Sequence, residues 1–181
     1  MGKSKAAKEL FSWTKAIITA VLFSCVIRMY LFSPIVVDGE SMMPTLQDED
    51  KIILSKRSDI DRFDIVVFHA TKEKDYIKRV IGMPGDHIEY KDDVLYINGK
   101  KYEEPYLDNE KKEYGQENLT EDFKLEDYTG AETVPENEYF VMGDNRRNSL
   151  DSRMIGTVSK EKITGQAEFL YWPMNDIQLI K

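Results

Sequence analysis

Two short runs decide the fold: DIVVFH at residues 64–69 and YIKRVI at residues 76–81. Both are rich in β-branched and aromatic residues, and polar residues separate them, which is typical of β-strands. Similar runs are KIILSK at 51–56 and residues 87–90, 94–97, 100–102, 138–142 and 168–172. Asn98-Gly99 and Asp92-Asp93 fit the turns between three of them. The body is therefore predicted to be mostly β, with only one short helical turn, near residues 159–163.

The N-terminal part follows a different pattern. Residues 16–37 read AIITAVLFSCVIRMYLFSPIVV, about the length that crosses a bilayer of roughly 30 Å as a helix. Pro34 is expected to end that helix. A cleaved secretory signal would have a shorter apolar core and a small-x-small cleavage site, and a buried core helix would show a polar stripe. A retained transmembrane anchor over residues 16–36 is the preferred interpretation.

Charge predicts the orientation of this anchor. Residues 1–15 carry four lysines against Glu9, although the whole chain has a net charge of −8. Basic residues favour the cytoplasmic side, so residues 1–15 are expected to be a cytoplasmic tail and residues 37–181 an extracytoplasmic domain. An acidic body is a poor partner for nucleic acid, because phosphates need cations. The single cysteine, Cys25, allows no intramolecular disulfide.

One stretch of the body is unusually acidic. Residues 103–132 hold eleven acidic residues against three lysines. Such a composition favours a long solvated excursion, either a hairpin extension or a partly mobile loop. The segment from about 100 to 135 is therefore interpreted as an insertion in the β domain.

Two polar loops are the candidate sites: DGESMMPTL at 38–46 and GDNRRNSLDSR at 143–153. Polar loops between apolar strands often carry function, although Ser41 could instead cap a turn. A nucleophilic serine needs a base. The two histidines, His69 and His87, lie in no recognisable triad context and offer no metal site.

A lysine can act as that base where apolar surroundings lower its pKa. Lys78 lies in the apolar run YIKRVI, whereas most other lysines lie in polar stretches. Side chains alternate along a strand, so Lys78 shares a face with Tyr76 and Val80, and Arg79 points the other way.

Three motifs together resemble bacterial type I signal peptidases. They are SMMPTL at 41–46, KRVIGMPGD at 78–86 and GDNRxNSxDSR at 143–153, in the family's order behind one apolar span. The resemblance covers the chain from about residue 12 to residue 175, and the single span is similar to the Gram-positive branch. It implies a two-part β fold shared with self-cleaving repressors of the Ser–Lys type.

The resemblance also implies roles for individual residues. Ser41 matches the nucleophile, Lys78 the general base and Ser149 the hydroxyl that orients the lysine amine. Asp144 matches an acidic support in the same loop, Asp151 and Arg153 match a supporting ion pair, and Arg79 matches an arginine with a structural role. The residues that match the walls of the small-residue pockets are Val37, Leu46 and Ile77. Gly39 departs from the pattern, since some members have a serine there that helps to hold the oxyanion. The oxyanion hole is therefore expected to use backbone N–H groups, including that of Ser41.

The expected function is that of a membrane-bound endopeptidase that removes signal peptides after small residues at positions −1 and −3. The resemblance implies no metal or organic cofactor. The expected partners are secretory preproteins and membrane lipid, with a functional link to the secretion translocase. Two alternatives stay open: a repressor-type Ser–Lys autoprotease, which would lack a span and carry a DNA-binding helix-turn-helix, and a membrane-tethered β module without activity.

Overall fold

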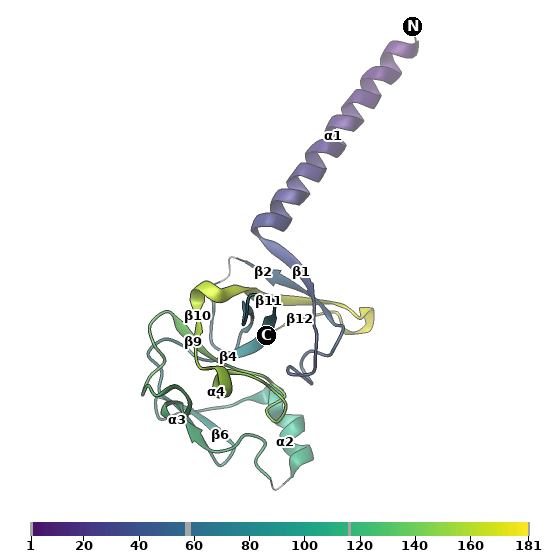
Figure 1. Ribbon diagram of the computed structural model, residues 1–181. Helices are drawn as coiled ribbons and strands as arrows, with labels where there is room; N and C mark the ends of the chain where they lie inside the picture. Colours follow the sequence, from purple (N-terminus) through teal and green to yellow (C-terminus); the bar gives the residue numbers. More distant parts are fainter. Residues whose placement is uncertain (1, 57–58, 116, 181) are drawn as a thin grey trace.

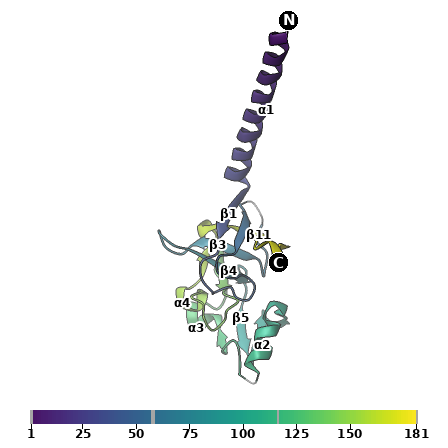
Figure 2. The same cartoon turned by 90° about the vertical axis from the view of Figure 1, so that its right-hand side faces the viewer.

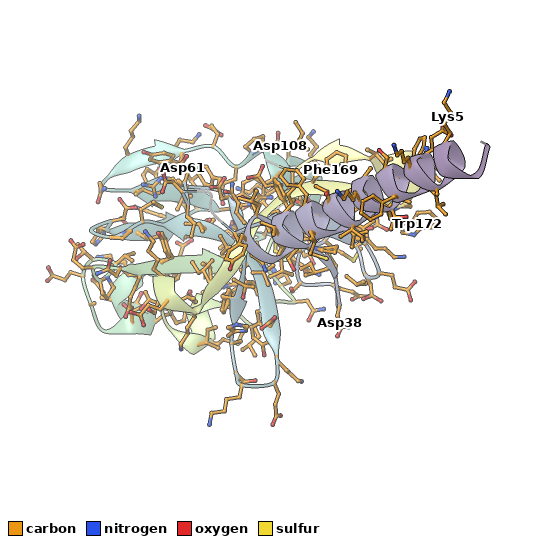
Figure 3. All side chains as sticks on the ribbon, turned by 90° about the horizontal axis from the view of Figure 1, so that it is seen from above. Lys5, Asp38, Asp61, Asp108, Phe169 and Trp172 are labelled. Carbon is orange, nitrogen blue, oxygen red and sulfur yellow. The ribbon has the colours of Figure 1, made fainter. Side chains whose placement is uncertain are left out.

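A computed structural model describes residues 2–56, 59–115 and 117–180. Its helix α1 (Gly2–Tyr30) projects away from a β-rich body (Figures 1 and 2). Within the described chain, one helix is long and apolar enough to cross a membrane, over Ala7–Ile27, and that stretch makes no contact that buries it. In the view from above, Lys5 lies near the outer end of this helix (Figure 3).

The helix itself does not have the bounds expected of residues 16–36. The helix begins before residue 16 and ends at Tyr30, and Phe32–Val36 form strand β1. β1 pairs antiparallel with β2 (Lys51–Ser55) and lies at the edge of its sheet. An edge strand tolerates Pro34, which lacks an N–H to donate, so this proline lies in a strand and does not end the helix.

The larger sheet has eight strands, and Figure 1 shows it at the foot of α1. Its order is β1-β2-β11-β3-β4-β9-β10, with β12 paired to β11. The strands not yet bounded are β3 (Ile65–His69), β4 (Asp75–Gly82), β9 (Glu138–Met142), β10 (Val158–Ser159), β11 (Ile163–Trp172) and β12 (Gln178–Leu179). One face packs a core that includes Leu54, Val67 and Ile77, and the other packs Phe68 and Val80.

The smaller sheet has four strands and lies at the end of the body farther from α1 (Figures 1 and 2). Its order is β7-β6-β5-β8, with β5 (Ile88–Lys91), β6 (Val94–Ile97), β7 (Lys100–Tyr102) and β8 (Phe123–Lys124). The fold is thus mostly β and in two parts, as predicted.

The acidic segment is not the solvated excursion that its composition predicted. It contributes β8, the short helices η1 (Pro105–Leu107), α2 (Asp108–Tyr114) and α3 (Leu125–Thr129), and several buried side chains. Those side chains are Glu104, Leu107, Leu119, Thr120, Phe123 and Leu125. The remaining short helices are α4 (Ser152–Ile155), η2 (Lys160–Lys162) and η3 (Met174–Asp176), so the helical turn predicted near residues 159–163 exists but is not alone.

Candidate active site

The nucleophile candidate and the base candidate meet beside β4, a strand inside the larger sheet. Ser41 lies in a turn that follows β1, and Lys78 lies in β4. Lys78 Nζ is hydrogen-bonded to Ser41 Oγ at 2.7 Å and donates to the Ile77 carbonyl at 2.9 Å. The lysine is only 3% exposed, whereas the serine is half-buried and reaches the cleft.

Burial changes the acidity of this lysine. Burial disfavours the charged amine and lowers the pKa of Lys78 from 10.5 to about 8, although the carboxylates of Asp151 and Asp144 oppose the shift. At this pKa, a substantial fraction of the amine is neutral in mildly alkaline solution. A neutral amine can accept a proton from Ser41, which an ordinary lysine at pH 7 almost never can.

A buried ion pair joins β4 to the second polar loop. Arg79 is 1% exposed and binds Asp144 with two hydrogen bonds, at 2.9 Å from Nε and 2.7 Å from Nη2. Asp144 Oδ2 also accepts a hydrogen bond from Thr45 Oγ1 at 2.5 Å. Because Thr45 belongs to the turn that carries Ser41, one carboxylate ties that turn, β4 and the 143–153 loop together.

A second ion pair, between Asp151 and Arg153, lies within the 143–153 loop. Asp151 is fully buried and accepts hydrogen bonds from Arg153 Nε at 2.9 Å and Nη2 at 2.8 Å. Asp151 also accepts from the Gly143 N–H at 3.0 Å. Burial alone would raise the pKa of Asp151, but Arg153 and this N–H bring it below its usual value.

Ser149 lies in the site but does not make the expected contact. Its buried Oγ makes no recorded hydrogen bond to the Lys78 amine among the described residues, and its contact with Asp151 helps to lower the pKa of that carboxyl instead. Gly143 explains why the two loops come so close. A Cβ at Gly143 would overlap Ser149 Oγ and the Ser41 carbonyl, and therefore only glycine fits there.

Arg146 supports the 143–153 loop, a role that sequence analysis did not identify. Its guanidinium is buried and bonded to Glu104 Oε1 at 2.5 Å and to the hydroxyls of Tyr90 at 2.7 Å and Thr120 at 2.9 Å. Its Nε donates to the Gly143 carbonyl at 3.2 Å. Glu104 lies 42 positions away in the acidic segment, so no local pattern could have indicated the pair.

An open cleft of about 460 Å³ runs past Ser41 and Lys78. Val37 and Ile77 line it as predicted, together with Ile35, Val67 and Tyr76, which were not singled out. Leu46 does not line it, because this side chain is fully buried in the core that contains Val37 and Ile77. Val37 and Ile77 therefore lie where a pocket wall was expected, Leu46 packs in the core instead, and the binding of small substrate residues there stays a prediction.

The two histidines are held by carboxylates outside this arrangement. His69 Nδ1 lies 2.5 Å from Asp75 Oδ1, and His87 Nε2 lies 3.7 Å from Glu126 Oε2. In the described part of the chain, no group of three or more His, Cys, Asp and Glu side chains could hold a metal ion.

The chain is similar to known proteins of one family. The model of the family "Signal peptidase, peptidase S26" matches residues 10–172. The chain belongs to the peptidase S26 family of signal peptidases. This S26 chain is 51% identical to signal peptidase I of Bacillus caldolyticus over 158 residues, which are 85% of this chain and 87% of that protein. It is 47% identical to signal peptidase I of Bacillus amyloliquefaciens, with 99% and 98% covered.

A solved structure supports the fold. The crystal structure of a signal peptidase I from Enterococcus faecalis V583 is 44% identical, with a TM-score of 0.58. The match covers 60% of the S26 chain described here and 97% of the Enterococcus chain.

Proposed function

We propose that this chain is a membrane-bound signal peptidase I, a serine endopeptidase that removes N-terminal signal peptides from preproteins. The observation that carries the proposal is the 2.7 Å hydrogen bond between Ser41 Oγ and the buried Lys78 amine, in an open cleft that both residues line. Membership of the S26 family supports the reaction class. Ser41 is proposed as the nucleophile and Lys78 as the general base.

The proposed reaction is acyl transfer through Ser41. When Lys78 is neutral, the Ser41 hydroxyl donates to its lone pair, and the amine takes the proton as Oγ attacks the scissile carbonyl. The carbonyl π electrons move to the oxygen, and the Ser41 N–H is the proposed backbone donor to that oxyanion. Lys78 then returns the proton to the leaving amine of the mature protein. The remaining acyl-enzyme is hydrolysed by a water that Lys78 deprotonates.

Supporting residues act by holding the dyad in place. The Arg79–Asp144 pair fixes β4 against the Ser41 turn through Thr45, and the Asp151–Arg153 pair fixes the 143–153 loop. Ser149 lies against Gly143, and its hydroxyl is within reach of Asp151. A small rotation of that hydroxyl during the reaction is its proposed contribution to orienting the Lys78 amine.

The cleft is proposed to bind the substrate as an extended strand. β4 pairs with β3 over residues 75–79, but its pairing with β9 begins only at Arg79. The other edge of residues 75–78 therefore has no strand partner among the recorded pairs, and a peptide can add there. Val37 and Ile77 then face alternate substrate side chains, and they leave room only for small residues at −1 and −3.

The membrane location is proposed from two surfaces. Helix α1 is exposed along its apolar length, and the neighbouring edge of the larger sheet exposes further large apolar side chains. These are Phe32, Val36, Trp172, Met174, Ile177 and Leu179. Contact with lipid would bury this surface and bring the cleft to the membrane, where preproteins leave the secretion translocase.

The lysines that precede the span support a cytoplasmic N-terminus. Protease added outside intact protoplasts should then digest the β body and spare the N-terminal tail. Protection of the β body in that experiment would contradict the proposed orientation.

The direct test of function uses the purified protein in detergent, a secretory preprotein and mass spectrometry of the product. We expect one new N-terminus immediately after the small residue at −1, and none with the Ser41→Ala variant. Absence of cleavage by the unmodified protein would instead support a non-catalytic tethered module.

A further inference from the structure

Asn145 holds the peptide units on both sides of Ser41. Its side-chain Nδ2 donates to the Glu40 carbonyl at 3.1 Å, and its backbone N–H donates to the Ser41 carbonyl at 3.1 Å. The Glu40 carbonyl also accepts the Met43 N–H at 3.1 Å, which closes the turn. The nucleophile is therefore clamped at both of its peptide bonds by one residue from another loop.

This clamp sets the direction of the Ser41 N–H. The Glu40 carbonyl and the Ser41 N–H belong to one planar trans peptide, so the two groups point in opposite directions. Fixing the carbonyl against Asn145 therefore fixes where the N–H points. Among the recorded hydrogen bonds of the described residues, the Ser41 N–H donates to no protein acceptor. It remains free for a ligand in the cleft that Ser41 lines.

Asn145 is well placed to act as a rigid support. Its chain neighbours are Asp144 and Arg146, and both side chains are buried in ion pairs, with Arg79 and with Glu104. The Asn145 carbonyl also accepts the Asn148 N–H at 3.0 Å. A half-buried amide between two such anchors has little freedom to move, which is the preorganisation that an oxyanion donor needs.

We propose that Asn145 is a positioning residue for the oxyanion hole: its amide fixes the Glu40–Ser41 peptide so that the Ser41 N–H points at the developing oxyanion. Gly39 makes this support important, because glycine supplies no side-chain donor two residues before the nucleophile. The inference rests on the proposed function, and it adds a residue that acts through the backbone of Ser41 and does not touch the substrate carbonyl.

The test measures kcat, KM and the affinity for a peptide aldehyde in Asn145→Ala and Asn145→Asp, with Arg147→Ala as control. The aldehyde reports on the donor directly, because Ser41 Oγ adds to its carbonyl carbon, the Ser41 proton passes to Lys78 and the carbonyl oxygen becomes the oxyanion. Arg147 is two residues away in the same loop, but its exposed guanidinium bonds to the Asn118 carbonyl and lies over Tyr114. Asn145→Asp keeps the shape of the amide without its donor.

Losing one oxyanion donor slows related enzymes by about 100-fold to 1000-fold, so a misdirected donor should lower kcat by about tenfold or more. We expect the aldehyde affinity to fall in parallel, while KM, the melting temperature and the midpoint of the pH profile stay near those of Arg147→Ala.

Unchanged kcat and aldehyde affinity in both Asn145 variants would overturn the inference. So would a change confined to KM, or a loss of activity that follows the melting temperature. If Ser41→Ala cleaved as well as the unmodified protein, the proposed function itself would fail.

Discussion

The Lys78 amine lies 2.7 Å from Ser41 Oγ and is 3% exposed, so the hydroxyl and its candidate base are in contact before any substrate binds. The contact requires a lysine to be buried without a carboxylate bonded directly to it. Both recorded hydrogen bonds of the amine go to neutral oxygens, those of Ser41 and of the Ile77 carbonyl. A buried amine with only neutral hydrogen-bond acceptors loses its proton readily. Burying the charged form of that amine also lowers the free energy of unfolding.

Replacing Lys78 by methionine should therefore inactivate the protein and stabilise it at neutral pH. The folded amine has a pKa of about 8 against 10.5 for an unburied lysine, so below pH 8 the folded state carries a charge that burial disfavours. The shift corresponds to a penalty on the order of 3 kcal/mol. Between about pH 8 and pH 10.5 the unfolded chain binds more protons, and the unmodified protein gains stability as pH rises.

Urea unfolding of the full chain in detergent checks this prediction at pH 7 and pH 10. We expect Lys78→Met to have the higher unfolding free energy at pH 7, with a smaller advantage at pH 10. A variant that is less stable than the unmodified protein at pH 7 would show that burial of the amine is not unfavourable.

The Arg79–Asp144 pair should be essential for stability. Both side chains are at most 1% exposed, and Asp144→Ala would leave a buried guanidinium without its carboxylate. Breaking such a pair is expected to lower the unfolding free energy by about 3–5 kcal/mol. The double variant Arg79→Met with Asp144→Leu removes both charges and should recover part of the loss. No recovery would mean that lost packing, and not the unpaired charge, is responsible.

Two adjacent glutamates in the acidic segment should behave very differently. Glu104 is buried against Arg146, whereas Glu103 makes an exposed ion pair with Lys101 at 2.9 Å. We expect Glu104→Ala to lose about 3–5 kcal/mol of unfolding free energy, and Glu103→Ala to change it by less than about 1 kcal/mol. Equal effects would refute a structural link between the acidic segment and the 143–153 loop.

Substrate choice should follow the size of the pocket beside Val37 and Ile77. Preproteins with Ala at −1 and −3 should be cleaved, and Phe at −1 should lower kcat/KM by at least about 100-fold, because the ring clashes with the wall. Ile77→Ala enlarges the pocket and should reduce the difference in kcat/KM between the Ala and Phe substrates. Efficient cleavage of the Phe substrate by the unmodified protein would rule out this pocket.

Most of the β body could be predicted because strand alternation is a local signal. Strands Val94–Ile97, Lys100–Tyr102 and Glu138–Met142 match the expected residues, and Lys78 faces away from Arg79 as the period of a strand requires. β1 was missed because its apolar residues continue the apolar run of the helix. Only pairing with β2, a long-range contact, makes them a strand.

The acidic segment was misjudged for a similar reason. Its composition indicates solvent exposure, and nothing local shows that Glu104 will be paired with an arginine 42 positions away. The family resemblance predicted that Ser41, Lys78, Asp144 and Asp151 lie in one site, and in the structure they lie close together. It did not identify Asn145, whose two contacts with the Ser41 turn depend on how the loops meet.

The most direct test of the Ser–Lys dyad is kcat/KM for preprotein cleavage from pH 6 to pH 10, in the unmodified protein, Lys78→Arg, His69→Ala and His87→Ala. In the proposed mechanism neutral Lys78 is the active form, so the rate should rise with pH to a plateau, with a midpoint near the pKa of about 8. Lys78→Arg should be inactive throughout, because guanidinium cannot be deprotonated, while both histidine variants keep most of the activity. Substantial activity in Lys78→Arg, or its loss in a folded histidine variant, would contradict the account.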